Sequence, residues 1–484
     1  MRKQALGLAL LCGLWFSVSM PVHAGGGALP AEVESGILSQ LRKAESKRGT
    51  AGCVVRDLDT GDTLLDFKAD ELLAPASNMK LVTTAAAMAT LGADFEFTTR
   101  VCARGTISNG TLQGDLCLVG GGDPNLSGRF HDGDVLAIYR AWAAVLSGRG
   151  VTRVTGDLQY ESSMFGGESF CDGWPKDDQY IKWYCAEVTA LAFNDNCVGI
   201  KVTPGKAGSP AKIETVPPTS YVKVINETTT LPGRKGAEIG IVRSRTDNTI
   251  TVKGKVYEGA SWGYSVDVTV HEPDCYAATV FKETLAAQGI VVAGAVKPVT
   301  LTREQFESAT TLVEHKAKLV DALTPINTNS QNLHAEMLLR QLGVRYTGKG
   351  TFKTGTAAVQ DYLKKEGLLK DGMVFLDGSG LSAANRVSAR LLSSLLYKIG
   401  GSTYFDTFRD SLAIGGESGT LEKRLNDSAL KGKVFAKTGF INGVRALSGY
   451  VITDRRRLCF SILMNDCAFS RECQDEIIKL LAKA

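Results

Sequence analysis

The sequence predicts an α/β protein of the α+β type, in which a layered domain of sheet and helices is interrupted by a β-rich insertion. Up to about residue 91 the pattern is that of a helix, a hairpin and a second helix, and helices return from about residue 302. Between them, residues 96–299 are rich in Gly, Thr, Val and turn signals, which favour short strands. The hairpin predicted over 51–67 needs sheet partners, and the apolar strands predicted over 432–464 can supply them. We therefore expect the two ends of the chain to form one discontinuous domain, 25–95 with 300–484.

The first 24 residues have the pattern of a secretory signal peptide. Arg2 and Lys3 precede an apolar run from Ala5 to about Val18, and small residues occupy the two positions that a signal peptidase reads before a cut after Ala24. The run is too short to span a bilayer permanently, and no later segment is long and apolar enough to act as an integral membrane segment. We expect an exported protein, periplasmic or in the cell envelope, that is soluble or peripherally associated.

Composition is that of a folded protein without a strongly charged partner. The 460 residues left after cleavage are enough for two or three domains, and 44% of the chain is hydrophobic while 22% is charged. Loss of the two cations of the signal peptide lowers the formal net charge from +4 to +2. This balance is too close to neutral to indicate binding of nucleic acid or anionic lipid.

The elements can be justified in order along the chain. A helix from about Ala31 precedes the hairpin, whose turn lies near Thr60-Gly61, and the helix over 79–91 follows Ser77, a favourable N-cap. The insertion contains strands and one helical segment near 135–146. The last part of the chain is predicted to contain helices over 331–342, 355–367 and 388–399, strands over 432–438, 443–453 and 457–464, and a terminal helix near 472–482.

Ten cysteines follow the signal peptide, and an even number in an exported chain indicates disulfides. Asn109-Gly110 is a favoured hairpin turn, and with these two residues as the loop Cys102 lies opposite Cys117, within disulfide reach. Cys467 and Cys473 are near enough in sequence to close a small loop. Pairings stay open for the other cysteines, which are Cys53, Cys171, Cys185, Cys197, Cys275 and Cys459. No Cys-x-x-Cys occurs and the five histidines are scattered, so we expect neither a metal nor a cofactor.

Three short motifs stand in a suggestive order. Ser77-x-x-Lys80 opens a helix, Ser330-x-Asn332 lies where a loop enters another helix, and Lys437-Thr438-Gly439 lies at the end of an apolar strand. The first pattern is common, because Ser209, Ser220 and Ser428 also begin one. Ser-x-Asn occurs once. Lys-Thr-Gly occurs a second time at 353–355, but in a turn-rich segment leading into a helix, so we select the copy at 437.

As a set, these motifs resemble those of the penicillin-recognising serine acyl-enzymes, which include D,D-peptidases and serine β-lactamases. The long insertion, with "LVGGGDPNL" (118–126), "ALAFNDNCVGIKVTPG" (190–205) and "FLDGSGLSAANRVS" (375–388), is similar to the penicillin-binding protein 4-type D-alanyl-D-alanine carboxypeptidases/endopeptidases. The resemblance implies a β-lactamase/transpeptidase-like domain with an antiparallel sheet flanked by helices. It also implies that 96–299 forms two smaller β-rich domains.

The chemistry of the first motif follows from its spacing. Side chains three positions apart on a helix are neighbours, so the Lys80 amine can reach the Ser77 hydroxyl. A serine hydroxyl is a weak nucleophile until a neighbour takes its proton, which Lys80 can do only when neutral. Burial and a second cation would both lower its pKa, and Lys437 is the candidate cation. The small apolar residues after Lys80 allow the helix to lie deep in the core.

The resemblance implies a role for each site residue. Ser77 is the acylated nucleophile, Lys80 its general base, and Ser330 relays a proton to the departing D-alanine. Five further residues bind the substrate: Asn332 holds an amide, Lys437 and Thr438 bind the terminal carboxylate, and Gly439 lets the substrate lie against the strand. The N–H group of the fifth, Phe440, forms the oxyanion hole together with that of Ser77. Peptidoglycan stem peptides are the implied substrates and β-lactam antibiotics the covalent inhibitors.

Two other functions stay open from the sequence. A serine β-lactamase needs a carboxylate to activate water, and Glu422 with Leu425-Asn426 matches such a signature, although it falls in a short amphipathic helix close to Lys437. A non-catalytic cell-wall scaffold would not need Ser77, Lys80, Ser330 and Lys437 together. His334, on the helix after Ser330, is interpreted as a packing or surface residue.

Overall fold

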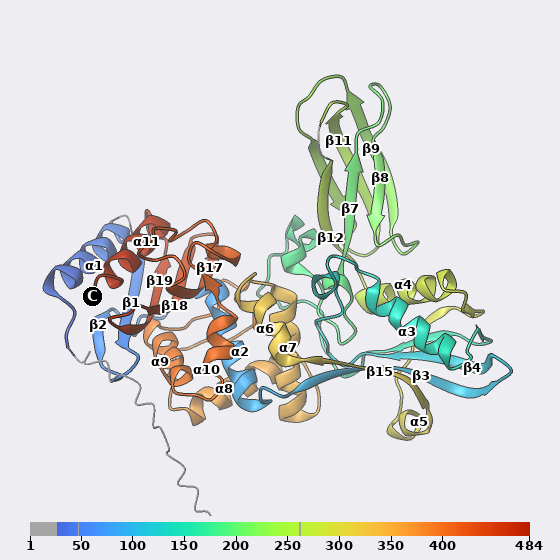
Figure 1. Cartoon of the computed structure of the whole chain (residues 1–484), viewed down its shortest axis with the longest axis horizontal. Coiled ribbons are helices and arrows are strands. Elements are labelled where there is room, and N and C mark those ends of the chain that lie inside the picture. Colours follow the sequence, from blue (N-terminus) through green and yellow to red (C-terminus); the bar gives the residue numbers. More distant parts are fainter. Residues whose placement is uncertain (1–26, 47, 261–262) are drawn as a thin grey trace, which may run out of the picture.

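The computed structural model describes residues 27–46, 48–260 and 263–484 (Figure 1). The predicted signal peptide lies outside these residues. Within them, no helix combines the length and apolarity that a bilayer crossing requires.

One antiparallel sheet is built from both ends of the chain, with strand order β16-β17-β18-β19-β1-β2. Its pairing places Thr50 opposite Asn465 and Asp57 opposite Leu458, so the N-terminal hairpin docks on the last strand. The predicted partnership of hairpin and C-terminal strands is thereby confirmed. The strands are β1 (Thr50–Asp57), β2 (Thr63–Phe67), β16 (Ala413–Ile414), β17 (Val434–Ile441), β18 (Val444–Ile452) and β19 (Arg457–Asn465).

Helices cover both faces of this sheet. On one face α1 and α11 lie side by side, the first and last helices in the described chain (Figure 1). The other face packs on α2, which is buried from Met79 to Met88 and surrounded by the remaining helices. The helices are α1 (Ala31–Ala44), α2 (Met79–Thr90), α6 (Leu319–Asn327), α7 (Asn332–Thr347), α8 (Phe352–Lys365), α9 (Ala389–Gly400), α10 (Phe405–Asp410) and α11 (Ser470–Leu481). The antiparallel sheet between helical layers confirms the predicted fold class.

The intervening chain leaves along β3 and returns along β15, which pair antiparallel beside each other (Figure 1). A sheet containing β3, β4, β5, β6, β13, β14 and β15 is covered by α3 and α4, and β7–β12 form two smaller sheets that stand away from it. The elements are β3 (Glu96–Ser108), β4 (Thr111–Val119), α3 (Ala137–Gly148), β5 (Arg153–Val154), β6 (Leu158–Glu161), β7 (Cys197–Thr203), β8 (Lys212–Val216), β9 (Lys223–Leu231), β10 (Glu238–Arg243), β11 (Thr249–Tyr257), β12 (Tyr264–Thr269), α4 (Pro273–Ala287), β13 (Val291–Val292), β14 (Val296–Pro298), α5 (Arg303–Ser308) and β15 (Thr310–Lys318). The domain boundaries at 95/96 and 299/300 stay a prediction.

The predicted hairpin register is confirmed, but the disulfides are not. Cys102 lies opposite Cys117 across the β3–β4 pair, as predicted. Both thiols are nevertheless free, as are the other cysteines of the described chain. The sulfur of Cys102 lies 3.8 Å from the Thr311 hydroxyl on the neighbouring strand β15. Cys53 and Cys459 cannot pair without rearrangement, because they belong to the cores on opposite faces of the central sheet.

Three local predictions differ from the structure. Helix α4 lies in the region predicted to form short strands, although its buried residues recur at i, i+3 and i+4 spacing along one side. Ser77 is not an N-cap but lies in a 3₁₀ turn, Ala76–Asn78, that precedes α2. The segment around Glu422 forms a 3₁₀ turn, Gly419–Leu421, with turns after it rather than an amphipathic helix.

Candidate active site

A cavity of about 540 Å³ opens where the Ser77 turn, the loop before α7 and the end of β17 meet. Side chains from the central sheet, from the α6–α7 connection and from the insertion line it. Its lining includes five of the eight predicted site residues, which are Ser77, Ser330, Asn332, Thr438 and Phe440. The other three, Lys80, Lys437 and Gly439, lie beneath it.

The Ser77 turn is held in place by close backbone packing. Ala76 has a left-handed φ of 45° and is fully buried. A Cβ at Gly380 would lie 1.8 Å from the Ala76 carbonyl oxygen, so only glycine permits the 377–380 loop to approach this turn. Gly439 has the same function on the other side, because its Cβ would lie 2.8 Å from the Pro75 carbonyl oxygen. Two backbone segments therefore fix the position of the serine from both sides.

The Lys80 amine has the contacts that a neutral base requires. It is fully buried, and its Nζ lies 3.1 Å from the Ser77 Oγ. It donates to the Asn332 Oδ1 at 2.7 Å and to the Ser379 carbonyl oxygen at 2.8 Å. A neutral amine has two N–H bonds and one lone pair. With both hydrogens given to these acceptors, its lone pair is left for the Ser77 hydroxyl.

Burial favours the neutral form of the Lys80 amine. It lowers the pKa of the Lys80 amine to about 7, although the nearby carboxylates of Glu336 and Asp377 act in the opposite direction. Burial, followed by the charge of Lys80, likewise lowers the pKa of Lys437 well below its usual range. Lys80 thus acts on the pKa of Lys437, whereas the lowering of the Lys80 pKa by Lys437 stays a prediction.

Glu336 completes this arrangement and was not predicted. It lies one helical turn after Asn332 on α7 and is fully buried. Its carboxylate accepts hydrogen bonds from the backbone N–H groups of Gly378, at 2.8 Å, and Ser379, at 2.7 Å. It thereby anchors the loop just before the Ser379–Gly380 peptide group, whose carbonyl binds Lys80 and whose N–H donates to Asp377. The i, i+4 spacing could have predicted that Glu336 lies on the same helix face as Asn332. No local pattern indicated that its carboxylate binds the backbone at 378–379.

Asp377 secures the same loop from within. Its carboxylate accepts from the backbone N–H groups of Gly380 and Ser382, and from the side chains of Trp174 and Asn385. Trp174 belongs to the intervening chain, so that segment also supports the Lys80 environment.

The Ser330-Gln331-Asn332 turn is strained and well anchored. Ser330 has a left-handed φ of 65°, which is costly for a residue with a Cβ. Gln331, rather than Ser330, caps α7, and its Nε2 donates to the Asp195 carboxylate at 3.1 Å. The Asn332 Nδ2 donates to the Tyr184 carbonyl at 2.8 Å, which turns its Oδ1 towards Lys80. Asn332 thus already has a partner on each side of its amide.

At the strand end, Lys437 and Thr438 face different surroundings. Lys437 is fully buried, and its Nζ donates to the Thr438 carbonyl at 3.0 Å. The Thr438 hydroxyl donates to the Thr420 hydroxyl at 2.8 Å, and both threonines line the cavity. Phe440 is 63% exposed, and the Arg445 guanidinium lies over its ring at 3.9 Å.

The alternatives weighed from the sequence lie outside this cavity. The second Lys-Thr-Gly, 353–355, lies in the first turn of α8. Glu422 is exposed and does not line the cavity. His334 is buried, and within the described residues neither ring nitrogen has a hydrogen bond, although the Asp195 Oδ1 lies 3.9 Å from its Nδ1. Burial lowers the pKa of His334 to about 4.

Comparisons with known proteins agree on one family. The model of the D-Ala-D-Ala carboxypeptidase 3 (S13) family matches residues 34–484. A D-alanyl-D-alanine carboxypeptidase of Actinomadura sp. is 35% identical over 452 residues, covering 91% of this chain and 82% of the relative. The D-alanyl-D-alanine carboxypeptidase DacB of Haemophilus influenzae is 26% identical, covering 86% of this chain and 85% of the relative.

The fold also matches a solved structure. The crystal structure of penicillin-binding protein 4 from Haemophilus influenzae superposes with a TM-score of 0.78 at 24% identity, covering 92% of this chain and 98% of that one. The same protein complexed with a β-lactam gives a TM-score of 0.74.

Proposed function

This chain belongs to the D-Ala-D-Ala carboxypeptidase 3 (S13) family, and on that premise we propose that Ser77 is the nucleophile with which it cleaves D-Ala-D-Ala ends of peptidoglycan stem peptides. The enzyme is a serine-type hydrolase of the D-alanyl-D-alanine carboxypeptidase class. The observation that carries the proposal is the buried Lys80 amine, whose lone pair is left for the Ser77 hydroxyl by its two acceptors.

Acylation begins when the Ser77 Oγ attacks the carbonyl carbon of the penultimate D-alanine and Lys80 takes the hydroxyl proton. The N–H groups of Ser77 and Phe440 stabilise the oxyanion, a contribution of about 3–4 kcal/mol in enzymes of this kind. Ser330 relays the proton that Lys80 has taken up to the amine of the departing D-alanine as the C–N bond breaks, so Lys80 returns to its neutral form and Ser330 keeps its hydroxyl proton. Water then hydrolyses the acyl-enzyme and restores the free serine.

The carboxylate of the leaving D-alanine binds at the end of β17. Thr438 lines the cavity there, and Lys437 lies directly beneath it. A substrate carboxylate next to Lys437 favours the protonated form of that amine, because opposite charges raise the pKa of a lysine. Substrate binding therefore charges Lys437, while Lys80 stays neutral for catalysis.

The same residues serve an endopeptidase reaction, in which the leaving group is a peptide instead of free D-alanine. They also serve acylation by β-lactams, because a strained lactam presents its carbonyl as the peptide does. A relative of the same fold has been solved with a β-lactam bound. The proposal includes cleavage of peptidoglycan cross-links. It also includes export of the enzyme and its action in the periplasm or cell envelope.

The proposed nucleophile can be tested with a fluorescent penicillin and with release of D-alanine from a pentapeptide. We expect Ser77→Ala to lose both activities. Ser428→Ala is the matched control, because Ser428 also begins a Ser-x-x-Lys pattern but is exposed and outside the cavity. Labelling of Ser77→Ala at the wild-type rate would exclude Ser77 as the nucleophile.

A rapid β-lactamase reaction is not favoured by this geometry. Glu422, the carboxylate weighed for activating water, is exposed outside the cavity. We therefore expect the penicilloyl-enzyme to outlast the seconds-or-less lifetime that an efficient β-lactamase would give. Rapid turnover of penicillin would contradict this expectation.

A further inference from the structure

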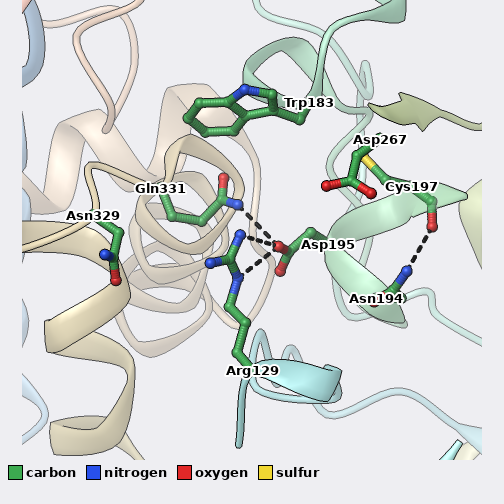
Figure 2. A pocket seen from close by; sticks show the side chains of 8 residues that line it. All are labelled: Arg129, Trp183, Asn194, Asp195, Cys197, Asp267, Asn329 and Gln331. Atoms are coloured by element: carbon green, nitrogen blue, oxygen red, sulfur yellow. Dashed lines mark hydrogen bonds and ion pairs between the residues drawn. The ribbon is translucent and has the colours of Figure 1, made fainter. Parts of the chain in front are cut away.

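A second cavity, of about 270 Å³, adjoins the candidate active site (Figure 2). The two cavities share Trp183 and Asn329 as lining residues. Its remaining wall comes from the loop before α7 and from the intervening chain. These lining residues are Arg129, Asn194, Asp195, Cys197, Asp267 and Gln331.

This cavity lies beyond the end of the active site at which the leaving group departs. Thr438, proposed to bind the leaving carboxylate, donates to the Thr420 hydroxyl. The Thr420 N–H in turn donates to the Thr328 carbonyl, at the start of the segment that contains Asn329 and Ser330. Asn329 then forms part of both cavities. A leaving group longer than one D-alanine would therefore extend past Ser330 into the second cavity.

The polar groups of the cavity have unused hydrogen-bonding capacity. One oxygen of Asp195 binds the Arg129 guanidinium at 2.7 Å and Gln331 at 3.1 Å. Its other oxygen, Oδ1, is buried without a hydrogen bond in the described residues and lies 3.9 Å from the Nδ1 of the buried His334. The Asp267 carboxylate, which is exposed to solvent, faces the same space (Figure 2), and partial desolvation together with the charge of Asp195 raises its pKa. Trp183 adds an aromatic surface, with its side chain 39% exposed.

We propose that this cavity is a binding subsite for the peptide on the leaving side of a cleaved cross-link. This inference rests on the proposed function and specifies its endopeptidase branch. The carboxylates of Asp195 and Asp267 accept hydrogen bonds from amide N–H or ammonium groups, whereas Arg129 donates to a carbonyl or carboxylate. A peptide carries groups of both kinds. A terminal D-alanine ends at Thr438 and does not reach them, so the cavity distinguishes the two reactions.

Asp267→Asn tests the subsite most cleanly, because Asp195 also holds Gln331. The readout is the ratio of kcat/KM for a cross-linked muropeptide dimer to kcat/KM for a monomeric pentapeptide. We expect this ratio to fall roughly tenfold, as for loss of one charge-assisted hydrogen bond. Asp267→Arg should lower it further, since the longer cationic side chain also fills the cavity. Glu227→Gln, at an exposed carboxylate on β9, should keep the wild-type ratio.

The outcomes separate the two proposals. An unchanged ratio in both Asp267 variants, or a parallel fall in both rates with the fold intact by thermal unfolding, would overturn the subsite and leave the carboxypeptidase proposal standing. Failure of the wild type to cleave the dimer while it releases D-alanine would do the same. A wild type that cleaves neither substrate would overturn the proposed function itself. Inhibition by the free leaving-side peptide, weakened in Asp267→Asn, provides a second supporting measurement.

Discussion

Helix α7 supplies one acceptor of the Lys80 amine and anchors the loop that supplies the other. Asn332 offers its side-chain oxygen directly, and Glu336, one turn later, accepts from the N–H groups of Gly378 and Ser379, next to the Ser379 carbonyl that binds Lys80. Burial raises the pKa of Glu336 to about 8, whereas these two hydrogen bonds act to lower it. Over neutral pH the proton affinities of Glu336 and Lys80 are therefore close, and each group's state depends on the other.

This coupling has a measurable effect on the pH dependence of acylation. Lys80 acts as a base only when neutral, so the acylation rate should rise as pH increases through about 7 and then level off. Glu336→Gln removes the carboxylate whose negative charge, in the fraction of molecules where it is ionised, stabilises the ammonium form of Lys80. The pKa of Lys80 should fall further, and the acid limb of the profile should move to lower pH. The measurement is the second-order rate constant for a fluorescent penicillin between pH 5 and 9.

A purely structural role for Glu336 predicts something different. Loss of packing alone would lower the rate at every pH and leave the midpoint of the acid limb in place. Glu422→Gln is the matched control, because Glu422 is exposed outside the cavity and its loss should not alter the profile. An unshifted midpoint in Glu336→Gln would contradict the coupling.

Among the helices and strands, those with a strong local sequence pattern were predicted most accurately. The β3–β4 register followed from Asn109-Gly110, and the central strands followed from their apolar runs. Helix α4 was not predicted, although Tyr276, Val280 and Thr284 recur at helical spacing, because small and polar residues on the buried side weaken the apolar pattern. The 3₁₀ turn carrying Ser77 was also missed, since its shape depends on distant glycines rather than on its own residues.

Gly439 shows how one element positions another. The sequence suggested that this glycine leaves room for substrate, but its own constraint is contact between β17 and the Ser77 turn. In Gly439→Ala the new methyl group would lie 2.8 Å from the Pro75 carbonyl and 2.9 Å from the Ala446 Cβ. We expect a loss of about 1–3 kcal/mol in the free energy of unfolding, together with slower acylation as the serine shifts. Denaturant unfolding and penicillin labelling measure the two effects.

Gly148→Ala provides the control for this variant. A Cβ at Gly148, at the end of α3, meets no atom within 4 Å, and alanine is a better helix former than glycine. This variant should be neutral or slightly more stable and should acylate normally. If Gly439→Ala had the same free energy of unfolding as the wild type, the prediction would be wrong, because β17 could then move to accommodate the methyl group without loss of stability.

For the whole molecule, the sequence identified the catalytic motifs but not their long-range supports. Ser77, Lys80, Ser330 and Lys437 occur in short recognisable patterns. Asp195 and Tyr184, by contrast, lie more than one hundred positions from the Ser-x-Asn turn that they contact, and a single sequence shows no trace of such pairing. The intervening chain is therefore part of the site's framework, although nothing in its local pattern indicated this.

Asp195→Ala tests whether the intervening chain positions the catalytic turn. The left-handed backbone of Ser330 costs about 1–3 kcal/mol and persists only while its surroundings hold it. Without the carboxylate, Gln331 loses its partner and the turn can relax, which moves the Ser330 hydroxyl. We expect penicillin acylation to slow roughly tenfold, with partial recovery in Asp195→Asn, whose remaining oxygen can still accept from Gln331. Because penicillin does not extend into the second cavity, this rate reports on positioning alone, and Glu227→Gln should acylate as the wild type does. Wild-type acylation in Asp195→Ala would mean that the Ser330 turn keeps its shape without help from the intervening chain.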